Sequence, residues 1–305
     1  MASKVLVLGA QGFLGRHVAQ YFKSEGVVTY GLGHGGWEKG QQCEWGVDNW
    51  LSGDINVESL KSMRATFDTI VHCAGGAEVG YSLNEPMKDF QRTVQSTLSV
   101  VEYMRLYNPK AKLIYPSSAA VQGACIDKPI KEGDVSNPVS PYGVHKKVAE
   151  EICLSYVKNF GLNITIIRFF SIYGNHLKKQ LLWDASSKLI DESEQAIFWG
   201  TGQETRDWIH VSDAVSLIAV LSENSVTPQI VNGGSGKRHT INEVLKVLRN
   251  ALIPKKQFTF NQETRAGDPA YYWADITKAR SLGWAPTVTI EDGISQYAEW
   301  FNSIK

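Results

Sequence analysis

The sequence is poor in the residues that build disulfide frameworks and metal clusters. Its 305 residues include only four cysteines, Cys43, Cys73, Cys125 and Cys153. No two of them form a C-x-x-C pair and no histidine cluster accompanies them, so neither a disulfide scaffold nor a metal site is expected. This usage of cysteine predicts a reducing, cytoplasmic environment.

Long apolar runs and an excess of one charge are also missing. No apolar stretch approaches the ~20 residues that a membrane span requires, so no membrane partner is expected. The apolar residues 5–10 pass directly into glycines and do not form the core of a signal peptide. The 31 acidic and 31 basic residues cancel, and the absence of a global field argues against a nucleic-acid partner. An anionic ligand must then be held by local groups.

What the first half does contain is a regular alternation of strand-like and helix-like segments. Strands are predicted at residues 5–8, 27–32, 69–73, 112–115 and 163–170, and helices at 14–25, 87–106 and 142–159. This order predicts an α/β fold, a Rossmann-type doubly wound parallel sheet with right-handed crossovers.

The alternation loosens after Gly174, where glycine-rich loops and recurring tryptophans take over. We expect a smaller α+β C-terminal substrate lobe there. The predicted division is a nucleotide-binding domain over residues 1–175, with returning elements around 205–235, and a mainly substrate-binding lobe over 176–305.

Three glycines spaced three apart follow the first predicted strand directly. Gly9 permits a sharp turn, Gly12 lets a pyrophosphate approach the backbone, and Gly15 lets the next helix pack closely. The spacing G-x-x-G-x-x-G differs from the usual G-x-G-x-x-G, and an ordinary turn is the alternative. The position after an apolar strand favours a phosphate site, whose contacts include the intervening Gln11, Phe13 and Leu14.

The segments that should contact the rest of a dinucleotide are less specific. The second strand ends without the acid that selects a free ribose 2′-hydroxyl, and His34 stands where it could meet a 2′-phosphate, so NAD and NADP both remain open. Asp54 and the adjacent Ile55 are candidates for the adenine subsite, with a simple turn as the alternative. Another strand ends on small residues, Cys73, Ala74 and Gly75, where a ligand can lie close to the backbone.

A tyrosine and a lysine lie four residues apart on a predicted helix. Tyr142 and Lys146 therefore share one face, and the ammonium group should lower the pKa of the phenol from its usual value of about 10. Such a phenolate can remove the proton of a sugar hydroxyl. Upstream, Ser117 and Ser118 end a strand with two hydroxyls available to hold the same oxygen. A surface pair is the alternative reading of Tyr142 and Lys146.

Together these motifs resemble those of the extended short-chain dehydrogenases/reductases, in particular the NAD-dependent epimerase/dehydratase family of nucleotide-sugar enzymes. The resemblance implies a catalytic group of Ser118, Tyr142 and Lys146, with Ser118 five residues before Gly123. It also implies cofactor contacts at Phe170, on the strand that passes under the nicotinamide, and at Thr93, where the family usually has asparagine.

The same resemblance extends to the substrate side. Arg206 and Arg265 would grip a nucleotide diphosphate, because a guanidinium fork suits phosphate oxygens; surface ion pairs are the alternative. Further substrate contacts implied by the resemblance are Val79, Ser171, Asp268 and Tyr272.

Departures from the family pattern bear on the reaction. Ala77 stands where many 4-epimerases have lysine, and Ala119 and Ala120 stand where 4,6-dehydratases carry an acid pair, which argues against dehydration. The expected activity is nucleotide-sugar epimerisation at C4 through a transient ketone. The alternatives are a 4-ketoreductase that consumes NAD(P)H and a catalytically silent NAD(P)-binding regulatory protein.

The two long predicted helices, residues 87–106 and 142–159, resemble those that pair across a two-fold axis in this family. The resemblance implies a homodimer through a four-helix bundle; the alternative is that their apolar stripes only serve the core.

Overall fold

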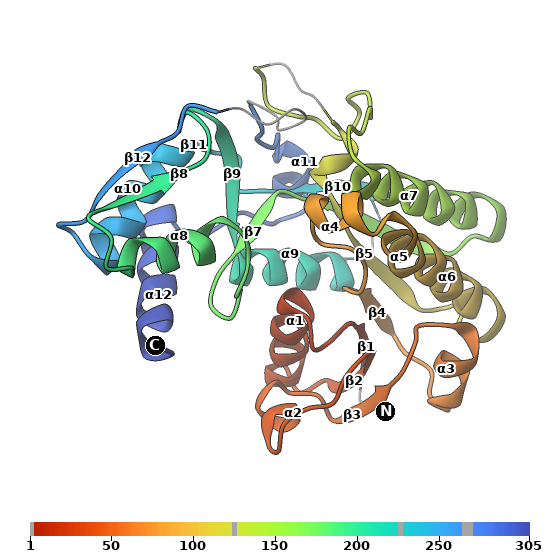
Figure 1. The fold of residues 1–305 in the computed structure, drawn as a ribbon. Coiled ribbons are helices and arrows are strands. Elements are labelled where there is room, and N and C mark those ends of the chain that lie inside the picture. The colour runs from red at the N-terminus through yellow and green to blue at the C-terminus, as the bar shows by residue number, and fades with distance from the viewer. Residues whose placement is uncertain (1–2, 124–126, 225–227, 264–270) are drawn as a thin grey trace.

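A seven-stranded parallel sheet forms the centre of the computed structural model, which describes residues 3–123, 127–224, 228–263 and 271–305 (Figure 1). In spatial order the strands are β10 (Ile230–Gly233), β6 (Asn163–Phe169), β5 (Lys112–Ser118), β4 (Thr69–His72), β1 (Lys4–Leu8), β2 (Val28–Gly33) and β3 (Asn49–Ser52). The order reverses between β1 and β4, and ligands bind at the carboxyl ends of strands at such a switch point. The predicted doubly wound fold is confirmed.

Helices cover both faces of this sheet because its strands alternate between two apolar cores. In β1, Val5 and Val7 belong to one core and Leu6 and Leu8 to the other. The first core lies under α1 (Phe13–Ser24), α9 (Val211–Glu223) and α11 (Thr277–Ser281). The second lies under α3 (Val57–Ser62), α6 (Ser96–Tyr107) and α7 (Pro141–Phe160). Burial on both faces explains why these strands are almost wholly apolar.

Two elements differ from the expectation for the first half. The helix predicted over 87–106 consists of α5 (Pro86–Phe90), a π-helical turn over Gln91–Gln95, and α6, with the short α4 (Val79–Asn84) before it. Strand β3, which follows the short α2 (Gln41–Glu44), was not predicted. It is a four-residue edge strand whose side chains are only partly buried, so it lacks the apolar run of a central strand.

The rest of the chain forms a second lobe with short sheets of its own (Figure 1). One sheet joins β11 (Arg238–Thr240), β9 (Thr205–His210) and β7 (Ser171–Tyr173), and the other joins β12 (Gln257–Phe260) and β8 (Gln195–Phe198). Helices α8 (Gln180–Ile190), α10 (Ile241–Leu252) and α12 (Ile290–Ser303) enclose a separate apolar core with them. Within the described residues, no helix combines the length and apolarity needed to cross a membrane.

Candidate active site

A cavity of about 860 Å³ opens at the carboxyl ends of β1, β2 and β4. Many of the predicted cofactor contacts line it: Gly9, Gln11, Gly12, His34, Asp54, Ile55, Cys73, Ala74 and Gly75. These residues come from four separate stretches of the chain, and the parallel sheet brings them together at one edge. We call this space the glycine-loop cavity.

The glycine turn at the base of this cavity is built as its spacing predicts. Gly9 has a φ of +77°, and a Cβ on Gly15 would lie 2.2 Å from the carbonyl oxygen of Gly9. Gly12 begins α1 without a side-chain cap, so the first N–H groups of the helix stay available to an anion. Phe13, Leu14 and Gly15 form the first turn of α1 and are not among the lining residues.

Two exposed side chains of this cavity, His34 and Asp54, contact each other. His34 Nε2 lies 3.0 Å from Asp54 Oδ1. Trp50 of β3 and Gly33, the last residue of β2, line the cavity beside them, and sequence reasoning did not select either. Asp54 thus already has a partner, and a bound adenine or ribose must share this pair or displace it.

The π-helical turn supplies a polar wall that sequence reasoning also missed. Lys88, Gln91, Arg92 and Gln95 line the glycine-loop cavity, and Ser96 and Ser99 continue the wall along α6. Their spacing of three and four residues was a usable signal, since it places them on one helical face. The π turn itself, a feature frequent at functional sites, has no comparable pattern in the sequence.

Ser118 and Tyr142 come together where β5 meets the start of α7. Ser118 is the last residue of β5. Its hydroxyl accepts a hydrogen bond from the Ala120 N–H at 3.1 Å and lies close enough to the Tyr142 phenol to lower the pKa of that phenol. Helix α7 begins at Pro141 with the Ser140 hydroxyl as its N-cap. A Cβ on Gly143 would lie only 2.6 Å from the Ala120 carbonyl, so glycine allows the helix to approach the strand end.

Lys146 follows Tyr142 by one helical turn and is buried. Its ammonium group donates a hydrogen bond to the Pro116 carbonyl at 2.9 Å and lies 5.0 Å from the centre of the Tyr115 ring. A Cβ on Gly75 would lie 3.7 Å from Lys146 Nζ, which places the ammonium beside the glycine-loop cavity. Burial lowers the pKa of Lys146 to about 8.

The expectation that Lys146 lowers the pKa of Tyr142 is wrong for the protein chain alone. Burial raises the pKa of the phenol to about 12, the hydrogen bond with Ser118 opposes this, and the negative charge of Asp89 adds to it. Sequence spacing placed the lysine one helical turn from the phenol, but burial is the largest influence on the pKa of Tyr142.

The second predicted hydroxyl, that of Ser117, is not available. It donates to Glu150 Oε1 at 2.5 Å inside a buried network, in which Arg168 Nη2 donates to Glu150 Oε2 at 2.7 Å. Ser117 points to the opposite face of β5 from Ser118, because successive strand residues alternate. Ser117 therefore holds α7 to the sheet, and Ser118 alone faces Tyr142.

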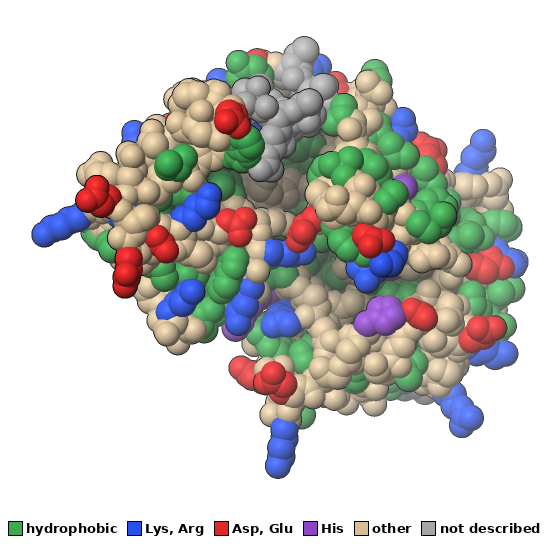
Figure 2. Space-filling model, in the orientation of Figure 1, with side chains coloured by type: hydrophobic (Ala, Val, Ile, Leu, Met, Phe, Trp, Pro, Cys, Tyr) green, Lys and Arg blue, Asp and Glu red, His purple; other side chains and the backbone are tan. Residues whose placement is uncertain are grey.

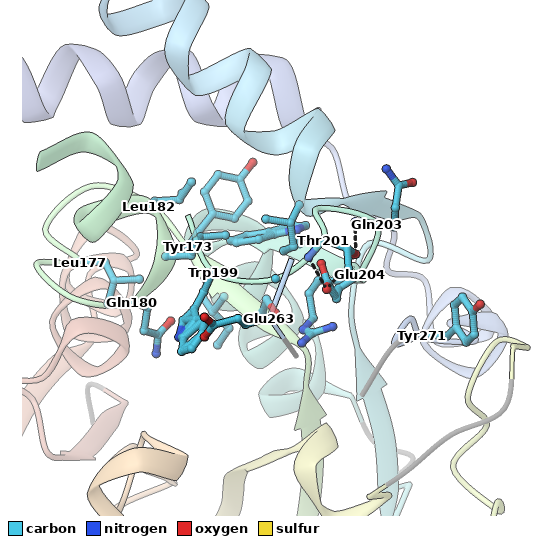
Figure 3. A pocket seen from close by; sticks show the side chains of 17 residues that line it. Tyr173, Leu177, Gln180, Leu182, Trp199, Thr201, Gln203, Glu204, Glu263 and Tyr271 are labelled. Carbon is cyan, nitrogen blue, oxygen red and sulfur yellow. Dashed lines mark hydrogen bonds between the residues drawn. The ribbon is translucent and has the colours of Figure 1, made fainter. Parts of the chain in front are cut away.

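A second cavity of about 530 Å³ lies in the C-terminal lobe (Figure 3). Two predicted substrate residues line it: Ser171 of β7 and Arg206 of β9. Figure 3 shows Leu177, Gln180 and Trp199 together on one side and Thr201, Gln203 and Glu204 in the turn on the other, with Tyr271 set apart. Glu204 fixes that turn by accepting hydrogen bonds from the N–H groups of Thr201 and Gly202, both at 2.9 Å. We call this space the lobe cavity.

The remaining predicted residues lie outside both cavities. Thr93 is buried, and its hydroxyl accepts a hydrogen bond from the Gly76 N–H at 2.9 Å. Phe170 packs against Tyr272 with ring centres 5.3 Å apart, and Val79 is exposed at the start of α4. Arg265 and Asp268 are outside the described residues.

Comparison with known proteins identifies the family of this chain. The model of the NAD dependent epimerase/dehydratase family matches residues 5–234. The chain belongs to this family. The motif resemblance found in the sequence is thereby confirmed.

Individual relatives are distant but similar over their whole length. A putative UDP-glucose 4-epimerase of Methanocaldococcus jannaschii is 27% identical over 98% of this chain and 98% of its own length. A UDP-glucuronate 4-epimerase of Thermodesulfobacterium geofontis is 26% identical over 97% of this chain and 95% of its own. The crystal structure of a UDP-glucose 4-epimerase from Brucella ovis in complex with NAD is 26% identical and covers 98% of each chain with a TM-score of 0.87.

Proposed function

We propose that this protein is an NAD-dependent nucleotide-sugar epimerase that inverts C4 of the sugar through a transient 4-keto intermediate. One observation carries the proposal: the Ser118–Tyr142 pair and Lys146 stand at the strand end that adjoins the glycine-loop cavity. The names of the relatives support it, since both UDP-sugar relatives, one of them as putative, and the Brucella ovis protein are named as 4-epimerases.

The residues of the glycine-loop cavity fit a dinucleotide. A Cβ would fill the space at Gly9 and Gly15, and the uncapped start of α1 offers N–H groups to a pyrophosphate. The absence of an acid at the end of β2 leaves His34 and Asp54 to meet the adenosine end. Bound NAD supplies reversible hydride acceptance at the sugar carbon. NADP is the alternative cofactor, and the lack of an acid at the end of β2 favours it.

The chain itself supplies the proton chemistry. Tyr142 accepts the proton of the C4 hydroxyl and returns it after the ketone has turned over, and Ser118 holds the same oxygen by a hydrogen bond. Lys146 is buried and cationic beside Gly75, where it would bind a ribose hydroxyl of the cofactor.

Binding of the nucleotide sugar is assigned to the lobe cavity and its surroundings. Arg206 would hold the diphosphate, and Ser171 would face the sugar. From the family pattern we add Val79, Arg265, Asp268 and Tyr272. In this scheme residues 1–175, with returning elements from 205–235, bind the cofactor and 176–305 mainly bind the substrate.

Mass analysis of the nucleotide released from purified protein, followed by incubation with UDP-sugars, tests the assignment. An epimerase should release NAD and isomerise the sugar with no added cofactor. Strict dependence on added NADH or NADPH would instead establish the 4-ketoreductase. This alternative is retained because Ala77 stands where many 4-epimerases have lysine. Bound cofactor without turnover of any sugar would establish the silent regulatory protein.

Gly15→Ala should weaken cofactor binding at least tenfold and lower the free energy of unfolding by about 1–3 kcal/mol, because its Cβ meets the Gly9 carbonyl. Gly36→Ala is the matched control, since a Cβ there meets no atom within 4 Å. NAD titration and urea unfolding of both variants measure the effects. Equal behaviour of the two variants would contradict the assignment of this turn.

We also propose that the protein is a homodimer through the surface of α4–α7. Exposed apolar side chains gather on these helices (Figure 2): Leu83, Met87, Phe90, Leu98, Leu106, Val144, Val148 and Phe160. A surface of this kind is typical of an interface, and a two-fold pairing would build a four-helix bundle from two copies of α6 and α7.

Val148→Lys should weaken this dimer at least ~30-fold, the equivalent of about 2 kcal/mol, since it places a charge in the apolar contact. Val135→Lys is the control, because Val135 is 86% exposed and outside α4–α7. Sedimentation equilibrium measures both variants. A monomeric wild type, or a dimer unaffected by Val148→Lys, would refute the proposed interface.

A cytoplasmic location completes the proposal. The cysteines Cys43, Cys73 and Cys153 are free thiols, which suits a reducing compartment. Cys125 lies outside the described residues.

A further inference from the structure

A buried aspartate and a histidine form a pair beside the active-site helix. Asp89 of α5 has no exposed surface, and its Oδ2 lies 2.5 Å from Nδ1 of His145. The His145 side chain is 12% exposed, with the Phe90 ring packed edge-on against it. His145 stands on α7 between Tyr142 and Lys146, so the pair lies within one helical turn of both.

The second carboxylate oxygen of Asp89 is also buried and, within the described residues, has no hydrogen-bond partner. It lies against the backbone of Gly76, where an added Cβ would be only 1.8 Å away. A second link ties the same segment to α7, because the Ser82 hydroxyl accepts a hydrogen bond from the Tyr142 N–H at 3.0 Å. The loop after β4 and α4–α5 is thus fastened to the beginning of α7.

This arrangement places the negative charge of Asp89 close enough to α7 to affect the pKa values of Tyr142 and Lys146. An isolated buried carboxylate is strongly disfavoured, and the imidazole of His145 is the partner that offsets it. Burial sets the raised pKa of Tyr142 first, and the charge of Asp89 raises it further. The same charge opposes the lowering of the Lys146 pKa by burial.

Other ionisable groups lie on the elements packed around the pair and its two neighbours. They are Glu150 and Cys153 on α7, His72 and Cys73 beside β4, Tyr115 on β5, Glu78, Tyr81 and Glu85 around α4, Lys88 on α5 and Arg92 in the π turn.

We propose that Asp89 and His145 form a charge-compensated pair that positions the start of α7 and sets how readily Tyr142 gives up its proton. The expected effect on the pH dependence of kcat rests on the proposed epimerase function. The contact between Asp89 and His145 does not depend on that function. Asp89 and His145 are positioning residues: neither is placed at the sugar. Their balance determines the pH range in which Tyr142 can act as a base.

The pH dependence of kcat in single variants tests this balance. Asp89→Asn removes the negative charge, so the acid limb of the profile should move to lower pH by roughly one unit. His145→Asn keeps a donor at the position of Nδ1 but removes the imidazole that offsets the Asp89 charge, so the limb should move up by a similar amount. The double variant restores a neutral, hydrogen-bonded pair and should lie near wild type.

Glu85→Gln is the matched control, because Glu85 lies one helical turn from Asp89 and its side chain is 45% exposed, in an ion pair with Lys88. Its profile should coincide with that of wild type. Shifts of both single variants in the same direction, or no shift in either, would overturn the proposal.

A titration without substrate separates this test from the epimerase assignment. The near-ultraviolet absorbance of the phenolate is followed in NAD-loaded wild type, Asp89→Asn and His145→Asn, each corrected with its own Tyr142→Phe counterpart. The apparent pKa of Tyr142 should fall in the first variant and rise in the second. If these pKa shifts are present but no sugar is epimerised, the proposed function is wrong and the role of the Asp89–His145 pair is kept. If sugars are epimerised but the pKa shifts are absent, the role of the pair is wrong and the proposed function is kept.

Discussion

Tyr142→Phe should reduce turnover of the nucleotide sugar by about 10²–10⁴-fold, because it removes the phenol that lies beside Ser118 and acts as acid and base in the proposed site. In the proposed mechanism the phenol takes and returns the proton of the sugar hydroxyl. The ring itself remains, so helix α7 and the cofactor cavity should be undisturbed. The loss should therefore appear in kcat with little change in the affinity for NAD.

Tyr30→Phe is the control for this substitution. Tyr30 lies on β2 against Phe67, with ring centres 5.2 Å apart, and the same hydroxyl is deleted there without touching the proposed site. Steady-state kinetics and NAD content are compared for both variants. If Tyr142→Phe retained wild-type kcat, the role given to Tyr142 would be wrong.

Glu150→Gln should lower the free energy of unfolding by about 3–5 kcal/mol, the typical cost of breaking a buried ion pair from one side. Glu150 and Arg168 are almost fully buried, and Arg168 donates to both carboxylate oxygens from Nε and Nη2. Without the carboxylate, the guanidinium stays buried and uncompensated, and a single amide oxygen is left to accept from both Ser117 and Arg168. The start of α7 then has a weaker hold on the sheet.

Lys128→Gln is the matched control because Lys128 pairs with Asp134 at 3.3 Å on the surface, with half of the lysine side chain exposed. Its cost should stay within about 1 kcal/mol. Urea unfolding of both variants measures the difference. A similar small cost for Glu150→Gln would mean that the buried network contributes little to the stability of the helix.

The glycine turn was predictable from the sequence because its requirements are local. Gly9 needs a positive φ and Gly15 needs the absence of a Cβ, and both follow from a strand that runs straight into a helix. The alternation of strands and helices fixed the fold class for a similar reason. Residues that follow the carboxyl ends of neighbouring parallel strands, such as Gly12 and Cys73, then necessarily lie close together.

The parts that sequence reasoning missed depend on contacts between distant segments. The pKa of Tyr142 is set by burial and by Asp89, which lies 53 positions earlier, and not by the helical neighbour Lys146. The role of Ser117 depends on which face of β5 carries Glu150. No local sequence pattern indicates the causes of the Tyr142 pKa or the contact between Ser117 and Glu150.

The polar wall of the cofactor cavity was missed for a related reason. Arg92 lies in the π turn over Gln91–Gln95 and lines the glycine-loop cavity. The spacing of three and four residues was a usable signal, but any exposed helical face shows it, so it did not single these residues out as cofactor contacts.

The most direct test of the central claim is nuclear magnetic resonance of UDP-glucose, UDP-glucuronate and UDP-N-acetylglucosamine, each incubated with the purified protein without added cofactor. The proposed function predicts that at least one sugar is converted to its C4 epimer to equilibrium, and that Tyr142→Phe abolishes the conversion. Unchanged spectra for all three sugars with NAD-loaded wild-type protein would contradict it.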